Sequence, residues 1–164
     1  MLYDVMINGN TIQPVRSAED LKAAVALFEL YAASLPVDLN YQDFNTELAS
    51  LPGKYAPPQG ELLLARAASA KPLGCVGLRP MSPKGRCEMK RLFLLPHARG
   101  LGLGKSLAGA AVKEAKRLGY RELFLDTLPT MAAAIQLYRQ IGFEQVPPYY
   151  APTPEGTVFM RLGL

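Results

Sequence analysis

Histidine and cysteine are scarce in this chain of 164 residues, which contains one of the former and two of the latter. The single histidine, His97, argues against a metal site built from several histidines, and we expect no metal. The cysteines, Cys75 and Cys87, both fall in expected strands. A disulfide is possible, but two cysteines in such a sequence favour buried, reduced thiols in a cytoplasmic protein.

Long apolar runs are also missing. No stretch approaches the roughly 20 consecutive apolar residues that a membrane-spanning helix requires. The first residues, Met1-Leu2-Tyr3-Asp4, lack the basic segment and the apolar stretch of a secretory signal. The sequence therefore predicts a cytoplasmic protein with no membrane partner.

The net charge of +4 is small but unevenly distributed. Residues 1–60 hold three basic and seven acidic side chains, whereas residues 84–121 hold ten basic and two acidic ones. The basic part suits an anionic ligand, and the acidic part could suit a cationic one. No signature of nucleic-acid binding accompanies the basic residues, so we expect no nucleic-acid partner.

Hydrophobic periodicity and turn residues predict a single α+β domain around a mixed sheet. Ser17 is the expected N-cap of the first helix, which Pro36 ends. Further helices are predicted over 43–51, 103–118 and 129–141. Strands are predicted over 5–15 with a turn at 8–10, and over 61–67, 73–78, 88–95, 122–127, 144–147 and 157–162.

The most informative segment is Arg99-Gly100-Leu101-Gly102-Leu103-Gly104, which follows a strand and opens a helix. Glycines here allow a tight turn and expose backbone N–H groups at a helix N-terminus, which together suit a phosphate or pyrophosphate. The spacing does not fit a dinucleotide-binding fingerprint. A P-loop would need glycine where Arg99 stands, although Gly104-Lys105-Ser106 fits its end. A glycine-rich turn that only packs helix on strand is the structural alternative.

A third interpretation is a family resemblance. The central region CEMKRLFLLPHARGLGLGKSLAGAAVKEAKRLGYRELFLDT and the later AIQLYRQIGF resemble the central motifs of the GNAT superfamily of acyl-CoA N-acyltransferases. In that family the pattern R/Q-x-x-G-x-G/A binds the CoA pyrophosphate. The resemblance is strong over residues 73–164. It implies a single GNAT-like domain over residues 1–164, with a mixed central sheet, about four flanking helices and a splayed strand at the acyl-CoA site.

The resemblance also implies acetyl-CoA as the acyl donor and assigns residues to it. The expected contacts are Leu92, Phe93, Leu94, Arg99, Gly100, Leu101, Gly102, Leu103, Gly104, Lys105, Ser106, Met131 and Ala134. The backbone amide of Leu94 is expected to meet the acetyl carbonyl. The family commonly has asparagine where this chain has Met131, so the turn's backbone, Thr127 or Thr130 is expected to substitute.

Catalysis is assigned to Tyr138 and Glu88. Tyr138 matches the tyrosine that protonates the departing CoA thiolate, and Glu88 lies where several family members place a general base. The structural alternatives are a tyrosine that only packs on the sheet and a carboxylate paired with Lys90 or Arg91. Tyr31, Tyr149 and Tyr150 are expected to line the acceptor pocket, and His97 is expected on the surface.

The sequence thus predicts an N-acetyltransferase that acts on a primary amine by direct attack in a ternary complex. The acceptor could be a small molecule, a peptide or a protein, and a homodimer is possible. The acidic residues Asp38, Asp43 and Glu47 would favour a cationic acceptor. A module that senses acyl-CoA without catalysis, and a P-loop nucleotide-binding protein, are the alternatives.

Overall fold

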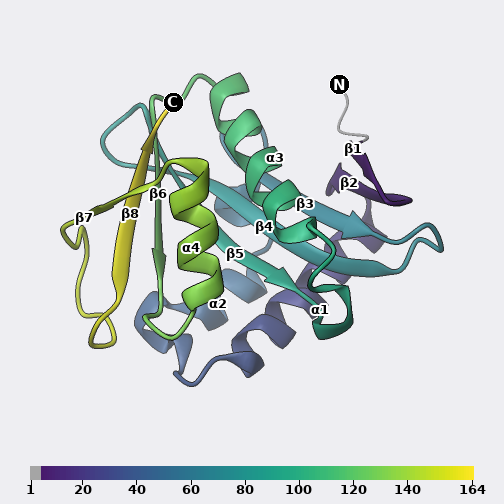
Figure 1. Ribbon diagram of the computed structural model, residues 1–164, viewed down its shortest axis with the longest axis horizontal. Helices are drawn as coiled ribbons and strands as arrows, with labels where there is room; N and C mark the ends of the chain where they lie inside the picture. Colours follow the sequence, from purple (N-terminus) through teal and green to yellow (C-terminus); the bar gives the residue numbers. More distant parts are fainter. Residues whose placement is uncertain (1–4) are drawn as a thin grey trace.

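The structure is a computed structural model that describes residues 5–164. The first four residues, on which the predicted lack of a secretory signal partly depends, lie outside this range. The described chain forms one mixed sheet, and its strand order is β1-β2-β3-β4-β5-β6-β8-β7 (Figure 1). The strands are β1 (Val5–Ile7), β2 (Asn10–Pro14), β3 (Glu61–Arg66), β4 (Pro72–Met81), β5 (Arg86–Leu94), β6 (Glu122–Thr127), β7 (Glu144–Val146) and β8 (Val158–Gly163).

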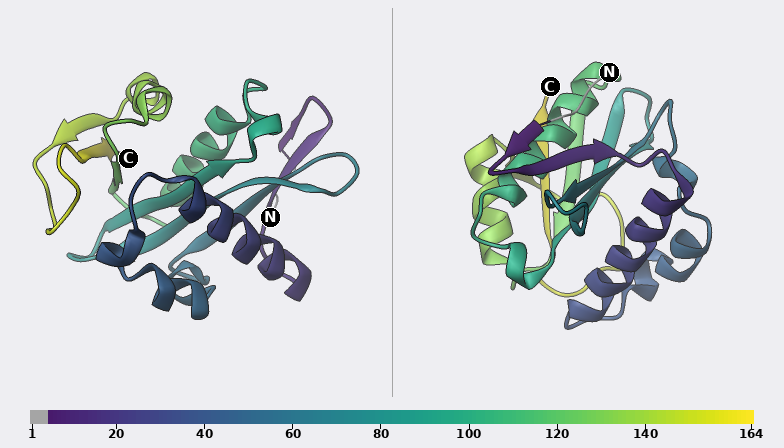
Figure 2. Two further views of the ribbon diagram at one scale, coloured as in Figure 1. Left: turned by 90° about the horizontal axis from the view of Figure 1, so that it is seen from below. Right: turned by 90° about the vertical axis from the view of Figure 1, so that its right-hand side faces the viewer.

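Helices cover both faces of this sheet. The helices are α1 (Ala18–Ser34), α2 (Phe44–Ala49), α3 (Leu103–Arg117) and α4 (Ala132–Ile141), with short 3₁₀ turns at Leu39–Gln42, Gly53–Tyr55 and Pro96–Ala98. Figure 2 shows α1 and α2 on one face, and α3 and α4 on the other. The α+β fold with four helices around a mixed sheet is therefore confirmed. Within residues 5–164 no helix is both long enough and apolar enough to cross a membrane.

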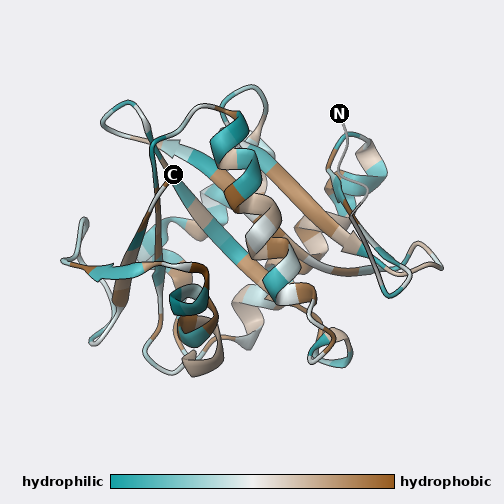
Figure 3. Cartoon of the chain, turned by 45° about the horizontal axis from the view of Figure 1, so that its top comes forward, coloured by the Kyte–Doolittle hydropathy of each residue, from teal (hydrophilic) through white to brown (hydrophobic). Residues whose placement is uncertain are grey.

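Each face of the sheet has its own hydrophobic core. Leu107, Ala111 and Leu123 belong to the core under α3 and α4, whereas Phe28, Leu62 and Phe93 belong to the core under α1 and α2. The hydrophilic residues of α3 gather near its two ends, and its middle turns are pale to brown (Figure 3). Because successive side chains of a strand point to opposite faces, each central strand supplies both cores.

The two cysteines follow this division. Cys75 lies in the core under α1 and α2, and Cys87 lies in the core under α3 and α4. Both are free thiols, and burial raises the pKa of each to about 12. The prediction of buried, reduced cysteines is confirmed.

Local sequence explains most element boundaries, with one clear correction. The turn predicted at 8–10 is confirmed, because Asn8 and Gly9 take left-handed backbone angles (φ +52° and +81°) that reverse the chain between β1 and β2. The predicted helix over 129–141 begins three residues later, at Ala132. Before it, the backbone N–H of Met131 donates to the carbonyl of Leu128 at 3.0 Å, which closes a turn.

The feature that matters most for function is the divergence of two parallel strands. β5 pairs with β6 only from Arg86 to Glu88, although β5 continues to Leu94 and β6 to Thr127. The two strands visibly separate toward their C-terminal ends (Figure 1). This confirms the predicted splayed strand.

A β-bulge accompanies the divergence. The register of β4 and β5 shifts between Cys75 and Gly77, and Arg91, which lies opposite this shift, has φ +62°. A bulge places two consecutive side chains on one face of a strand. Lys90 and Arg91 accordingly line the same cavity on the α1 and α2 side.

The N-cap of α1 gives a test of local stability. The Ser17 hydroxyl accepts from the Asp20 N–H at 3.0 Å, and the Asp20 carboxylate accepts from the Ser17 N–H at 3.2 Å. We expect Ser17→Ala to lower the free energy of unfolding by about 1 kcal/mol, measured by urea denaturation. The control is Ser34→Ala in the last turn of α1, where no cap is lost and little change is expected. Equal effects of the two substitutions would contradict this assignment.

Candidate functional site

An apolar groove of about 480 Å³ opens beside the free end of β5. One wall is the end of β5 itself, the second is the start of α4, and the third is the C-terminal end of α1. The residues that line it are Tyr31, Ser34, Leu35, Pro36, Leu92, Phe93, Leu94, Arg99, Gly104, Thr130, Met131, Ala132, Ala133, Ala134 and Leu137. A groove of this size and lining suits an elongated, largely apolar ligand segment.

The glycine loop lies at one end of this groove. Gly100 and Gly102 have φ +81° and +80°, and Gly102 is the N-cap of α3. A Cβ built at either glycine would meet no atom within 4 Å, so the space above the loop is open. Open space at the N-terminus of a 15-residue helix favours an anionic group.

The structure brings the predicted cofactor residues together. Seven of them line the groove directly: Leu92, Phe93, Leu94, Arg99, Gly104, Met131 and Ala134. The others lie in the adjoining loop and first turn of α3, where Leu101 is half exposed and Ser106 donates its hydroxyl to the carbonyl of Gly102 at 3.0 Å. Leu103 is 1% exposed, so its side chain packs in the core and does not line the groove.

Arg99 joins the glycine loop to the strand. Its Nε donates to the carbonyl of Leu94 at 3.1 Å, and its guanidinium lies 5.9 Å from the ring centre of Phe93. The charged group is thus held between the open loop and the splayed end of β5. This position suits recognition of a phosphate that follows an apolar arm.

Tyr138 lies on α4 beside Leu137, which lines the groove, but Tyr138 itself is part of the core on the α3 and α4 side. Its side chain is 6% exposed, and its ring packs edge-to-face on Phe143. Burial raises the pKa of the Tyr138 phenol, and Tyr31 and Asp126 raise it further. The hydroxyl therefore stays protonated at physiological pH, which is the form that a proton donor needs.

A profile of the Acetyltransferase (GNAT) family matches residues 24–143. The chain belongs to the GNAT family of acetyltransferases. An uncharacterized N-acetyltransferase of Schizosaccharomyces pombe is 39% identical over 154 residues, which cover 94% of each chain.

Two solved structures have a fold similar to that of this GNAT chain. A putative acyl-CoA N-acyltransferase from Klebsiella pneumoniae superposes with a TM-score of 0.74 at 26% identity, covering 94% of this chain and 97% of that one. The putative acetyltransferase yncA from Salmonella typhimurium, described with its cofactor acetyl-CoA, has a TM-score of 0.71 at 20% identity and covers 94% and 93%.

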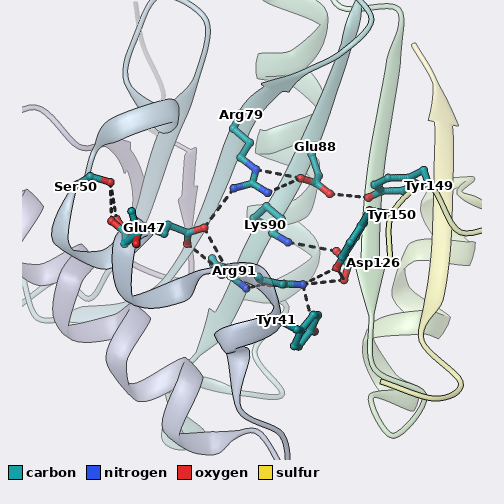
Figure 4. A network of polar contacts seen from close by, with 12 residues as sticks. Tyr41, Glu47, Ser50, Arg79, Glu88, Lys90, Arg91, Asp126, Tyr149 and Tyr150 are labelled. Carbon is teal, nitrogen blue, oxygen red and sulfur yellow. Dashed lines mark hydrogen bonds and ion pairs between the residues drawn. The ribbon is translucent and has the colours of Figure 1, made fainter. Parts of the chain in front are cut away.

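Beyond the groove, this GNAT chain carries a network of buried charges between β4, β5, β6 and α2 (Figure 4). Its cations are Arg79, Lys90 and Arg91, and its carboxylates are Glu47, Glu88 and Asp126. Among residues 5–164 no group of three or more histidine, cysteine or acidic side chains could hold a metal ion.

Glu88, the predicted base, is held at the paired end of β5. One carboxylate oxygen accepts from Arg79 at 3.0 Å, and the other accepts from the Tyr149 hydroxyl at 2.7 Å. Lys90 and Arg91, the alternative partners expected from the sequence, pair instead with Asp126 and Glu47. Tyr149 therefore contacts the predicted base, and Glu88 has both oxygens engaged.

Asp126 lies on β6 two residues beyond Phe124, the last residue of β6 that pairs with β5. Its Oδ2 accepts from the Tyr150 hydroxyl at 2.6 Å and from the Gln42 amide at 3.0 Å. Its Oδ1 faces the Lys90 ammonium at 3.4 Å. The predicted acceptor-pocket residues Tyr149 and Tyr150 thus lie together over two carboxylates, whereas Tyr31 lies at the boundary with the groove.

Arg91 fixes α2 to the bulge. Its Nε donates to the Glu47 carboxylate at 2.9 Å, its Nη1 donates to the Gln42 side-chain oxygen at 2.6 Å, and it lies 5.2 Å from the ring centre of Phe44. The Arg91 side chain is 2% exposed. These contacts hold the strained backbone that begins the groove wall.

The three acidic residues named for a cationic acceptor, Asp38, Asp43 and Glu47, already have partners within the chain, and none of them lines the groove. Asp38 is exposed and accepts from the Asn40 N–H at 2.9 Å, and exposed Asp43 accepts from the Thr46 hydroxyl at 2.9 Å. Glu47 is neutralised by two arginines. Sequence reasoning missed the network, because it considered Asp126, at the end of Leu123-Phe124-Leu125, only as part of a magnesium-binding strand in the P-loop alternative.

The buried pairing of Glu47 can be compared with an exposed one. Glu47 pairs with Arg79 and Arg91, and Glu122 pairs with Arg86 and Arg161. The first set is the more buried, since the Arg91 side chain is 2% and the Glu47 side chain 10% exposed, against 24% for Glu122. We expect Glu47→Ala to lower the free energy of unfolding by about 3 kcal/mol or more, because Arg91 loses its buried partner. Glu122→Ala should cost less than about 1 kcal/mol. Urea denaturation of both variants measures the difference, and similar losses would contradict this account.

Proposed function

We propose that the chain transfers an acetyl group from acetyl-CoA to a primary amine, by direct attack in a ternary complex. The observation that carries the proposal is the groove along the splayed end of β5, which is lined by Arg99 and Gly104 of the glycine loop and by Leu137, the neighbour of Tyr138 on α4. Pyrophosphate, pantetheine and thioester would follow one another along this groove in that order.

The residues present fit such a donor. The amides at the N-terminus of α3, with Arg99 and Lys105, supply donors and positive charge for a pyrophosphate. The apolar walls from Leu92 to Leu94 and from Met131 to Ala134 suit the pantetheine arm. Within the described chain, β5 has no strand partner on its β6 side after Glu88, so main-chain groups there are available to a ligand.

The chemistry needs the amine nitrogen to bond to the acetyl carbon while the carbon–sulfur bond breaks. Under this proposal the backbone amide of Leu94 polarises the acetyl carbonyl. Tyr138 gives its proton to the departing thiolate, and the surplus proton of the amine passes through water to Glu88. Tyr31, Tyr149 and Tyr150 surround the acceptor. No covalent enzyme intermediate is required, because both cysteines are buried in cores with raised pKa values.

A direct assay tests the whole proposal. Release of free CoA from acetyl-CoA is measured with a panel of amines: glycine, L-glutamate, putrescine, benzylamine and the dipeptide alanylglycine, with mass identification of each product. Acetyl-CoA is expected to raise the melting temperature, because a ligand that binds the native state stabilises it. Stabilisation without CoA release would favour the acyl-CoA sensor. Stabilisation by ATP with magnesium alone would favour a nucleotide-binding protein.

Replacement of the proposed acid gives the sharper prediction. We expect Tyr138→Phe to lower kcat by about 100-fold or more, because the variant cannot donate a proton to the thiolate. Stabilisation by acetyl-CoA should persist, since binding does not use the hydroxyl.

The matched control is Tyr120→Phe. The Tyr120 hydroxyl donates to the carbonyl of Gln59 at 2.6 Å, away from the groove, and kcat should not change. Unchanged turnover in Tyr138→Phe would remove Tyr138 from the mechanism.

A further inference from the structure

A small cavity lies between the donor groove and the charge network and is lined by residues of both. Tyr31 and Leu35 line both spaces, and Lys90, Arg91 and Asp126 line the small cavity alone. Its volume of about 20 Å³ is enough for one water-sized group, since roughly 10–15 Å³ suffices for a water molecule. Through Tyr31 and Leu35 it adjoins the groove, and through Asp126 it reaches a carboxylate of the network.

Glu88 and Asp126, the two carboxylates nearest the divergence of β5 and β6, differ in how many further hydrogen bonds their oxygens can accept. Each oxygen of Glu88 already accepts a short hydrogen bond, at 3.0 Å from Arg79 and 2.7 Å from Tyr149. For Asp126, Oδ2 is engaged in the same way, but the sole described partner of Oδ1 is Lys90 at 3.4 Å. A buried carboxylate oxygen with one long contact retains lone pairs for a further donor.

Position also separates the two carboxylates. Glu88 faces Phe124 at the last paired register of β5 and β6, and it lines neither the groove nor the small cavity. Asp126 lies past that register and lines the cavity. It is also near enough to act electrostatically on the Tyr138 phenol, whereas Glu88 has no resolved effect there.

We propose that Asp126 receives the acceptor amine in this cavity, with Lys90 as the counter-ion that balances its charge. This inference rests on the proposed N-acetyltransferase function and adds a residue that binds the second substrate. The amine donates a hydrogen bond to Oδ1 on the side of the cavity that adjoins the groove at Tyr31 and Leu35, so that its nitrogen faces the thioester and its carbon chain points away from it. Because the space admits one water-sized group, a primary amine fits and an N-methyl amine does not. Burial lowers the pKa of Lys90, and the nearby carboxylates of Glu88 and Asp126 oppose that shift.

The test compares Asp126→Asn with Asp43→Asn, using acetyl-CoA and the most active amine of the panel above. Asp43 is exposed and has φ +55°, which asparagine tolerates, so that control makes the same chemical change without strain. We expect Asp126→Asn to raise KM for the amine by about 10- to 100-fold, the loss typical of a charged hydrogen bond. KM for acetyl-CoA should change less than about twofold, and Asp43→Asn should match wild type.

A second measurement uses only the unaltered protein. The N-methyl derivative of the same amine should lose at least about 10-fold in kcat/KM relative to the primary amine, because a methyl group exceeds the space. Equal use of both amines would overturn the inference even if Asp126→Asn failed to fold.

Different results would contradict the proposed N-acetyltransferase function and the role of Asp126. If wild type releases no CoA with any amine, the proposed function fails and the inference fails with it. If wild type is active but the amine KM of Asp126→Asn stays within twofold, or Glu88→Gln raises that KM more than Asp126→Asn does, the inference alone fails.

Discussion

The divergence of β5 and β6 is the constraint on which the site depends. Parallel strands normally satisfy each other's main chain along their whole length. Here pairing stops at Glu88, and the space between the strands holds both the groove and the buried charges. Helices cover both faces of the sheet, and they shield the apolar side chains on either side of the divergence from solvent.

The bulge at Arg91 determines what fills that space. In a regular strand Arg91 would point to the α3 side, as Met89 does. Its left-handed backbone instead turns it to the side of Lys90, where Glu47 and Gln42 bind it. The same bulge returns Leu92 and Leu94 to the α3 side and Phe93 to the α1 side. One strained residue therefore sets the lining of the groove and the position of the charges.

Local signals in the sequence predicted the elements well. The helix from Leu103 ends at Arg117, one residue before the predicted end, because Gly102 and Gly119 mark its limits. The strand at 122–127 matches, since an uninterrupted apolar run indicates a buried strand. The start of α4 was misplaced because proline at position 129 suits a first helical turn and a preceding loop equally. The glycine loop was predictable because all its residues are adjacent in the chain.

The charge network was not predictable, because its partners are distant in sequence. Glu47 and Arg91 lie 44 positions apart, and Gln42 and Tyr150 lie 108 apart. Spacing gives no information on such pairs, and the bulge that turns Arg91 has no glycine to mark it. The sequence therefore suggested pairing of Glu88 with its neighbours on the same strand, which the fold replaces with contacts across strands.

Burying three cations with three carboxylates is costly, and such pairs often add little net stability compared with an apolar core. Stability alone therefore gives a poor reason for this arrangement in the middle of the sheet. The contacts are also unequal: Glu47 and Glu88 are fully engaged by arginine or tyrosine, whereas Asp126 keeps an oxygen toward the small cavity. A network that served only packing would be expected to satisfy every member. That carboxylate, Asp126, lines the small cavity beside the donor groove. Its Oδ1 can therefore accept a further hydrogen bond at the place where, under the proposed function, the acceptor would meet the acetyl donor.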